Sequence, residues 1–339
     1  MSPTLSADTM ILGAGIAGLR AAQQLQAAGE SVLLLDKARH PGGRCATRRL
    51  TADPDSPSFD IGAQYLTARA PAFARAVRGW VAQGVLQGWS PRLARQSGPE
   101  SWEPSSDATP RWLAPGGFNQ WPRAWAAQLQ REGLRLHCSH RVQALEGLAR
   151  GWRVHGSGAA YSARRVLLAM PPAQAAALLL PVAPQLCPSR RLAPCLTAVY
   201  AAPAGAADFD ALFGDGAPLA WAARSGARPG ARNGGATDYW TLHAGVAESQ
   251  RLAERDPQEV AAVLGDAFAA LIGLAPAALE CVHARHWRYA RLPEGLDQEP
   301  QAVFDADAGL GLCGDWLGRG RIEDAWLSGD AAAQAVLTA

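Results

Sequence analysis

Lysine is almost absent from this chain. Of its 339 residues, 32 carry basic side chains and only one of these, Lys37, is a lysine. With 30 acidic residues the formal net charge is +2. A charge so close to zero gives no electrostatic reason for binding nucleic acid or an anionic membrane, so we expect neither as a partner.

Signals for metals, secretion and membrane passage are also missing. The six cysteines form no CxxC pair and no cluster with histidine at metal-ligand spacing. We therefore predict no metal site and reduced thiols in a cytoplasmic protein. Residues 1–8 carry no basic or apolar signal region, so we expect no secretory signal. The longest apolar run, 175–182, is far shorter than the ~20 residues of a membrane-spanning helix.

The remaining composition is globular, with 48% hydrophobic and 18% charged residues, enough for about two domains. Apolar runs at 9–12 and 31–35, with a helix-forming stretch between them, predict a strand, helix, strand unit. Further predicted helices lie at 73–83, 119–132, 257–272 and 323–337, and further strands at 134–138, 142–148, 152–154, 166–169 and 310–313. Between 173 and 299 we expect mainly helical apolar runs and loops rich in glycine and proline.

A glycine pattern, GAGIAG, follows the first predicted strand. Gly13, Gly15 and Gly18 would allow a tight turn, a close approach to a pyrophosphate and close packing of helix on strand. Asp36 ends the second predicted strand at a spacing typical of an acid that binds an adenosine ribose. GxGxxG alone is weak evidence, because glycines are common at turns from strand to helix. The context favours a dinucleotide.

The sequence PGGRCATRR, at 41–49, makes the pattern more specific. Its glycines can bring the backbone close to a ligand, and Arg44 can offer a planar fork to phosphate. A strand, GxGxxG, helix, strand, acid and then GGR resembles the flavin-binding start of the amine-oxidase and glutathione-reductase class of FAD proteins. With FDIGAQYLTAR at 59–69, HWRYARLP at 286–293 and GLCGDWLGRGRIEDAWLSGDAAAQAV at 311–336, the chain most resembles the renalase family, especially its bacterial members. Residues 175–280 are covered only weakly.

The resemblance implies an α/β fold like that of amine oxidases and p-hydroxybenzoate hydroxylase. Its Rossmann-type FAD-binding domain would comprise 1–70, 116–172 and 300–339, and a second, α+β substrate domain would comprise 71–115 and 173–299. It also implies the FAD contacts. The residues so implied are Gly13, Gly15, Ile16, Ala17, Gly18, Asp36, Lys37, Gly43, Arg44, Asp60, Gly62, Ala63, Gln64, Val142, Gly314, Asp315, Glu323, Asp324 and Ala325.

These contacts would divide along the cofactor. The glycine loop and Arg44 would bind the diphosphate, Val142 would lie against adenine, and the segment from Asp60 to Gln64 would run beside the isoalloxazine. The start of the closing helix could direct its partial positive charge at the flavin pyrimidine. Here the family commonly has a Gly-Ala pair where this chain has Asp324 and Ala325, and the added carboxylate disfavours a close backbone approach.

The flavin would supply the hydride chemistry, so the protein needs to supply position, electrostatics and access. Many flavin amine oxidases place a lysine near flavin N5, but the only lysine here, Lys37, adjoins the expected ribose-binding acid. Cys313 and the other cysteines lie outside any context resembling covalent flavin attachment, so FAD should be non-covalent. Renalases oxidise the 2- and 6-dihydro isomers of NAD(P), with O2 as acceptor and H2O2 as product.

Such a substrate needs a flat aromatic slot and cations near its phosphates. For reaction and positioning we select His243, Trp287, Tyr289 and Gln64, with Trp240 and Trp326 as further slot candidates. Among 31 arginines, Arg224, Arg228 and Arg232 are candidates for phosphate, although a solvated surface is the preferred interpretation. The alternatives are a flavin amine oxidase or desaturase acting on a small hydrophobic substrate, and a non-catalytic FAD-binding protein. We expect a monomer or weak dimer.

Overall fold

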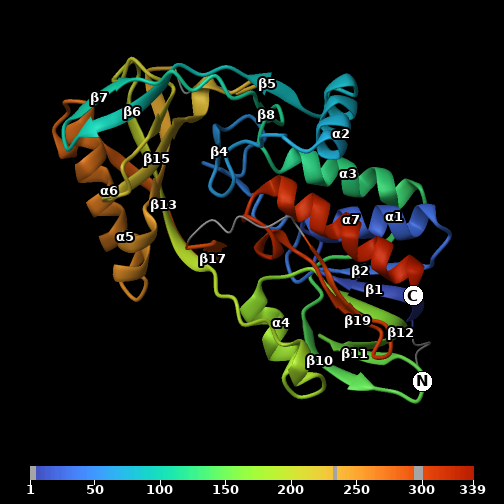
Figure 1. Ribbon diagram of the computed structural model, residues 1–339. Helices are drawn as coiled ribbons and strands as arrows, with labels where there is room; N and C mark the ends of the chain where they lie inside the picture. The colour runs from blue at the N-terminus through green and yellow to red at the C-terminus, as the bar shows by residue number, and fades with distance from the viewer. Residues whose placement is uncertain (1–4, 232–234, 294–300) are drawn as a thin grey trace. The chain divides into compact units, whose positions relative to one another are not determined.

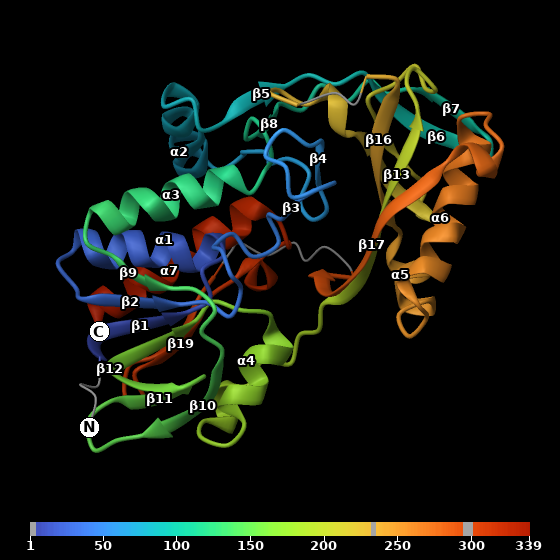
Figure 2. The ribbon, with the colours of Figure 1, turned by 180° about the vertical axis from the view of Figure 1, so that it is seen from behind.

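A computed structural model describes residues 5–231, 235–293 and 301–339 (Figures 1 and 2). The chain divides into two compact units, each built from separate stretches of sequence. The first unit comprises 1–43, 122–192 and 294–339, and the second comprises 44–121 and 193–293. Among the described residues, the packing boundaries differ from the functional domains expected from the sequence at 44–70, 116–121 and 173–192. Because a ligand-binding domain need not coincide with a packing unit, the functional boundaries stay a prediction.

The first unit is built on an eight-stranded sheet with a parallel centre. Its path runs β10-β11-β12-β1-β2-β9, with β19 paired to β12 and β18 paired to β19. Strands β1, β2, β9, β12 and β19 are parallel, whereas β10, β11 and β18 add antiparallel pairs. The strand bounds are β1 Leu5–Leu12, β2 Val32–Leu35, β9 Arg135–His137, β10 Val142–Gly147, β11 Trp152–Gly156, β12 Ala159–Leu168, β18 Val303–Asp305 and β19 Leu310–Leu312.

Two helices from opposite ends of the chain lie side by side in this unit, as both views show (Figures 1 and 2). A Cβ on Gly329 of α7 would lie 2.2 Å from the carbonyl oxygen of Ala17 in α1, so a glycine is needed for this approach. Arg20 of α1 also pairs with Asp330 of α7 at 2.6 Å. The helix bounds are α1 Ile16–Ala27, α3 Gln120–Arg131, which begins at the boundary of the second unit, α4 Pro172–Leu179 and α7 Ile322–Thr338.

The second unit contains a seven-stranded sheet in the order β17-β13-β16-β15-β14-β6-β7. Its strand bounds are β6 Leu93–Gly98, β7 Ser101–Pro104, β13 Ala193–Pro203, β14 Ala211–Phe213, β15 Leu219–Arg224, β16 Thr237–Ala244 and β17 Glu280–Arg291. The smaller elements are β3 Thr47–Arg49, β4 Ser58–Asp60, β5 Gln87–Trp89, β8 Arg111–Leu113, α2 Pro71–Ala82, α5 Val246–Arg251 and α6 Pro257–Leu271.

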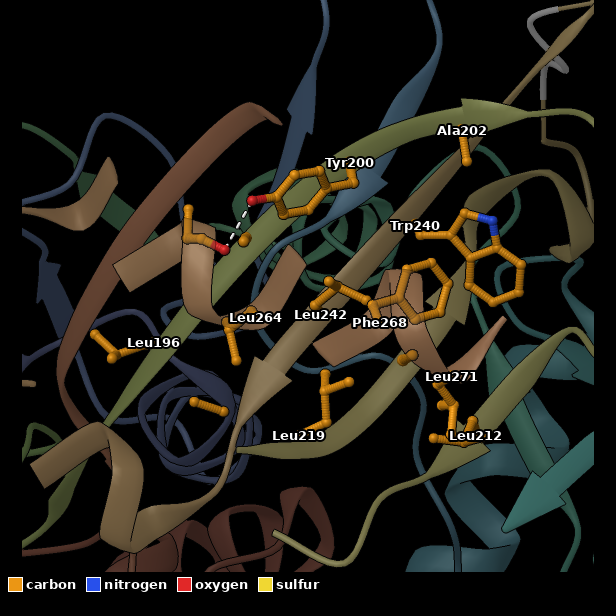
Figure 3. Packing of buried hydrophobic residues seen from close by; sticks show 14 of the residues in the cluster. Leu196, Tyr200, Ala202, Leu212, Leu219, Trp240, Leu242, Leu264, Phe268 and Leu271 are labelled. Atoms are coloured by element: carbon orange, nitrogen blue, oxygen red, sulfur yellow. Dashed lines mark hydrogen bonds between the residues drawn. The ribbon is translucent and has the colours of Figure 1, made fainter. Parts of the chain in front are cut away.

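One face of this sheet is covered by α5 and α6, and an apolar core fills the contact (Figure 3). Alternate residues of β13 and β16, such as Ala198 and Leu242, join Leu264 and Phe268 of α6 in this core. Tyr200 reaches across and donates a hydrogen bond to the carbonyl of Ala261 at 2.7 Å. Because neighbouring strand residues point to opposite faces, the residues between these core positions are directed to the other face.

The overall α/β expectation is confirmed, and the predicted strand, helix, strand unit is present as β1, α1 and β2. The expectation of mainly helices and loops in 173–299 is wrong, because five strands of the second sheet lie there. Segments such as Leu219–Arg224, with the sequence LAWAAR, have a run of buried apolar residues and lack the polar alternation of a half-exposed strand. Such runs do not distinguish strand from helix by periodicity.

Candidate functional site

The glycine turn of the first unit has the geometry of a close-packed phosphate loop. A Cβ on Gly13 would lie 2.3 Å from the carbonyl oxygen of Ala169, and one on Gly18 would lie 1.9 Å from the carbonyl oxygen of Gly13. Both positions therefore exclude a side chain for reasons of packing. At Gly15 an added Cβ would meet no described atom within 4 Å. Open space in front of this residue is what a bound diphosphate requires.

Gly15 is also the N-cap of α1, and as a glycine it has no side chain to cap the first turn. The first N–H groups of a helix have no partner within the helix, and they bind anions well. Ile16 and Ala17 form this turn and are buried. Gly43, at φ +57°, lies close by, because a Cβ there would contact the Cα of Gly15 at 3.5 Å.

Asp36 is tied to the same turn. Its carboxylate accepts hydrogen bonds from the backbone N–H of Ala14 at 2.6 Å and of Ala38 at 2.7 Å. Burial raises the pKa of Asp36, and these two hydrogen bonds oppose that effect. A carboxylate oxygen can accept two hydrogen bonds, and each oxygen of Asp36 accepts one here. The carboxylate can therefore also accept a hydrogen bond from a ribose hydroxyl. Beside it, Lys37 donates to Gln174 at 2.8 Å on the exposed surface. Val142 begins β10 and is half-buried.

The start of α7 forms the other part of the first unit's candidate site. Gly314, Asp315, Glu323 and Ala325 are buried there. A Cβ on Gly314 would lie 2.6 Å from the Trp316 indole nitrogen.

Asp324 turns back toward its own helix start, where its carboxylate accepts hydrogen bonds from the backbone N–H of Arg319 and Arg321. The departure from the Gly-Ala pair therefore serves as a helix cap. Gly318 leaves room for this cap, because a Cβ on Gly318 would make a tight contact of 3.0 Å with the Asp324 Cβ.

In the second unit, the segment from Asp60 to Gln64 packs against the backbone around Arg44, just before β3 begins. Ala63 N–H donates to the carbonyl of Arg44 at 3.0 Å, and a Cβ on Gly62 would lie 2.0 Å from the same oxygen. Gln64 is buried and donates through its side-chain amide to the carbonyls of Asp60 and Gly62. Arg44 donates to the carbonyl of Ala290 at 2.7 Å. These bonds fix the segment's shape.

Asp60 is the centre of a buried polar cluster. It forms an ion pair with Arg228, and it accepts hydrogen bonds from the Thr47 hydroxyl at 2.5 Å and the Phe118 backbone at 2.9 Å. Burial lowers the pKa of Arg228 to about 10. The preferred interpretation of Arg228 as a solvated surface residue is therefore wrong.

The other two arginine candidates differ in what the structure shows. Arg224 pairs with Asp210 and Asp238, and Arg232 lies outside the described residues.

His243 and Trp287 meet at one backbone group. Trp287 donates its indole N–H to the carbonyl of Ile61 at 2.7 Å, and the His243 ring also hydrogen-bonds the Ile61 backbone. Burial, and secondarily the charge of Arg291, lower the pKa of His243 to about 3, while the Ile61 bond acts in the opposite direction. The imidazole is therefore neutral at pH 7. These two residues are 44 positions apart in sequence, and the structure brings them together.

Trp287 carries a second contact, because the Arg285 guanidinium lies 4.2 Å from the centre of its ring. Tyr289 follows in the same strand and is half-buried. The two other slot candidates are Trp240 and Trp326. Trp240 belongs to the core under α6 (Figure 3). It lies on the opposite face from His243, because the two are an odd number of positions apart in β16. Its core position makes the slot assignment wrong for Trp240. Trp326 is buried in the first unit, with the Arg20 guanidinium 4.0 Å from its ring centre, and its assignment stays a prediction.

Three residues that the sequence did not single out share the face of His243. Thr197 on β13 and Trp221 on β15 are directly opposite His243 in the two flanking strands. Thr241 lies two positions before His243 on β16, and so on the same face. Only strand register places them here, and no motif in the sequence marks them.

No helix in the described residues is long and apolar enough to cross a membrane. Within 5–231, 235–293 and 301–339 no three His, Cys, Asp or Glu side chains are grouped as ligands for a metal ion.

Comparisons with known proteins agree with this geometry. Residues 11–80 match a family described as NAD(P)-binding Rossmann-like domain. Solved structures of wild-type putrescine oxidase bound to putrescine and of cyclohexylamine oxidase from Brevibacterium oxydans IH-35A are each 16% identical, with TM-scores of 0.69 and 0.70. Each alignment covers 99% of this chain, and they cover 100% and 99% of the respective structures. At such identities they show the fold alone.

Curated relatives match only a short segment. The chain is 38% identical over 60 residues to Protein FLOWERING LOCUS D of Arabidopsis thaliana and 38% identical over 65 residues to lysine-specific histone demethylase 1 homolog 3 of Oryza sativa subsp. japonica. These segments are 18% and 19% of this chain, and they span 8% of the length of each relative.

The broadest match is to the family described as flavin containing amine oxidoreductase, which covers residues 77–337. The glycine turn, the open space at Gly15 and the buried acid Asp36 fit the diphosphate and ribose of its cofactor, FAD. The chain therefore belongs to the flavin-containing amine oxidoreductases, a family of FAD-dependent enzymes.

Proposed function

We propose that the protein is an oxidase of dihydronicotinamide dinucleotides, acting on the 2- and 6-dihydro isomers of NAD(P) as bacterial renalases do. FAD, which Gly15, Gly18, Asp36 and Arg44 would hold, would supply a hydride acceptor and a route for two electrons to O2, so that the dihydronicotinamide, O2 and one proton give NAD(P)+ and H2O2. The protein's part is to bind the cofactor, hold the ring of the substrate and keep charged acid-base groups away from it.

The observation that carries this proposal is the chemical character of the His243 face. Paired residues of β17, β13, β16 and β15 form a row across the sheet. The row consists of Arg285, Thr197, His243 and Trp221, and so contains neither a lysine nor a carboxylate. The nearby carboxylate of Asp60 is neutralised by Arg228, and the side chain of Lys37 is hydrogen-bonded to Gln174. An ammonium substrate must lose a proton before it gives up a hydride, whereas a dihydronicotinamide does not. The basic atom on this face is Nε2 of His243, and the lowered pKa of that ring makes it a poor proton acceptor, so the face favours the dihydronicotinamide.

The cofactor contacts are part of the same proposal. In the first unit Gly15, Gly18 and the start of α1 would bind the diphosphate, and Asp36 the adenosine ribose. In the second unit Arg44 would contribute a cation, and Asp60–Gln64 would run beside the isoalloxazine. FAD is proposed to be non-covalent, because Cys313 is fully buried and burial raises the pKa of its thiol to about 12. Attachment of a flavin needs a reactive thiolate.

A second candidate, oxidation of a small amine, is favoured by the family match. Aromatic rings that could attract a cation do gather around Trp221, since Tyr65 lies at 5.4 Å and Phe213 at 5.1 Å between ring centres. The guanidinium of Arg111, however, already lies 5.1 Å from the Tyr65 ring centre and 5.6 Å from that of Phe213. Arg111, which is paired with Asp107, already occupies these ring faces, so we place amine oxidation second.

The test is anaerobic mixing of the FAD-loaded protein with each substrate while flavin absorbance is recorded. The 2- or 6-dihydro isomers should bleach the flavin band within seconds, and admission of O2 should restore it with formation of H2O2. Putrescine, cyclohexylamine and benzylamine should act far more slowly. Rapid bleaching by an amine, with none by either isomer, would replace this proposal with amine oxidation, and no bleaching by any compound would support a non-catalytic FAD protein. Monomer or weak dimer and cytoplasmic location remain proposals, and six cysteines outside any disulfide support a reducing compartment.

A further inference from the structure

Polar atoms without partners are concentrated on one face of the second unit's sheet. The Thr197 and Thr241 hydroxyls, the Trp221 indole nitrogen and the Nε2 atom of His243 are buried, and none has a hydrogen-bond partner among residues 5–231, 235–293 and 301–339. Folded proteins leave few buried polar atoms unpaired, and each exception calls for an explanation such as a bound group. Four such atoms on one face point to a ligand.

Three of these residues are immediate neighbours. Thr197 and Trp221 are both paired with His243 in the strand register, one on each side. Side chains directly opposite each other in antiparallel strands have Cβ atoms about 4.5–5.5 Å apart. The three polar groups therefore lie within reach of one small ligand group.

Their hydrogen-bonding roles differ. An indole N–H only donates, and a threonine hydroxyl donates or accepts. His243 bonds the Ile61 backbone through one ring nitrogen, so in the neutral ring the unpaired Nε2 is an acceptor. The matching ligand group must carry a donor for His243 beside an acceptor for Trp221. A carboxylate has no donor, and an ammonium has no acceptor.

We propose that Thr197, His243 and Trp221 form a recognition site for a primary carboxamide. The amide N–H2 donates to His243 Nε2, and the carbonyl oxygen accepts from the Trp221 indole and the Thr197 hydroxyl. This inference rests on the proposed function, since the dihydronicotinamide ring bears a primary carboxamide, and it names the residues that would read that group.

Neighbouring aromatic rings hold the Trp221 indole in place. The Trp221 ring contacts Tyr65, Phe213 and Trp89, with centre distances of 5.4, 5.1 and 6.5 Å. A ring restrained on several sides loses little freedom when it binds, which favours selectivity.

Binding of fragments to the FAD-loaded full-length protein tests the site without turnover. Nicotinamide and 3-acetylpyridine share the ring and the carbonyl, but only nicotinamide has amide N–H groups. Calorimetric titration of the wild type should show about tenfold tighter binding of nicotinamide, the size of one hydrogen bond to a buried acceptor. His243→Leu should weaken nicotinamide about tenfold and leave 3-acetylpyridine nearly unchanged.

Two tryptophan variants provide the matched comparison. Trp221→Phe removes the donor to the shared carbonyl, so both fragments should weaken by about the same factor. Trp240→Phe removes an indole nitrogen that is likewise buried and unpaired among the described residues, but on the opposite face, and should change neither affinity. Circular dichroism and flavin content would verify that each variant is folded and loaded.

The results separate this site from the proposed function. Equal wild-type affinities, no measurable binding of nicotinamide, or equal losses in the Trp221 and Trp240 variants overturn the carboxamide site even if dihydronicotinamides reduce the flavin. A nicotinamide preference that His243→Leu abolishes supports the site even if no dihydronicotinamide is oxidised.

Discussion

Asp60 and Arg228 form an ion pair in which both side chains are almost completely buried, although they are 168 positions apart in sequence. Arg228→Ala would leave the carboxylate of Asp60 buried without its counter-charge. We expect a loss of about 3–5 kcal/mol in the free energy of unfolding. Urea denaturation would measure it. Arg92→Ala is the control, because Arg92 is 57% exposed and its partner Asp210 keeps Arg224, so the loss should be ~0–1 kcal/mol. Equal losses would contradict the buried pairing.

Gly15 and Gly18 should respond oppositely to the same substitution. Gly15 has φ −76° and open space where a Cβ would lie, so Gly15→Val should keep the stability of the FAD-free protein and lose FAD. A Cβ at Gly18 would meet the Gly13 carbonyl at 1.9 Å, so Gly18→Ala should lower the unfolding temperature itself. The measurements are flavin content after gel filtration and thermal unfolding of the two apoproteins. Full flavin retention by Gly15→Val would show that the FAD diphosphate does not bind at Gly15.

His243 should make stability dependent on pH. Its folded pKa, about 3, is below the unfolded value near 6.5, so between these values the unfolded chain binds a proton that the native protein does not. The free energy of unfolding therefore falls as pH falls through this window. From pH 7 to pH 5 the wild type should lose about 2 kcal/mol more than His243→Gln, which has no titrating ring. Denaturant unfolding at both pH values measures the difference. Identical losses would show that His243 titrates normally.

The first unit could be predicted well from the sequence because its signals are local. Gly13, Gly15 and Gly18 are close in the chain, and Asp36 follows after one helix, so spacing alone indicates a strand, helix, strand unit. Asp324 is the exception. Its carboxylate suggests repulsion near a flavin when read by position, yet the structure uses it to cap α7.

The second unit depends on relationships that the sequence does not display. Trp240 and His243 are three positions apart, but strand alternation puts them on opposite faces, which requires knowing that 237–244 is a strand. Trp221 joins His243 only through the pairing of β15 with β16. Arg228 looks like one of many surface arginines until its pairing with Asp60 is seen.

Trp287 should matter for reaction rate and little for cofactor retention. Its indole is anchored to the carbonyl of Ile61 and packs with Phe59 and Val199, so it can hold a planar ring in a fixed orientation. Orientation of this kind lowers the barrier, and a misplacement of about 1 Å can cost roughly a hundredfold in rate. Trp287→Ala should slow flavin reduction by the dihydronicotinamide at least about tenfold. Trp287→Phe keeps a ring but loses the hydrogen bond to Ile61, so its rate of flavin reduction should lie between those of the wild type and Trp287→Ala.

Stopped-flow absorbance under anaerobic conditions gives the reduction rate, and the ratio of flavin to protein absorbance gives the FAD content. Trp240→Phe is the control, because that ring lies in the core under α6 and should leave the reduction rate unchanged. A Trp287→Ala protein that loses its FAD but is reduced at the wild-type rate after reloading would assign Trp287 to cofactor binding instead. Trp287 and His243 bond the same Ile61 backbone. A slower reduction rate in both Trp287→Ala and His243→Leu would therefore indicate that this shared anchor positions the substrate.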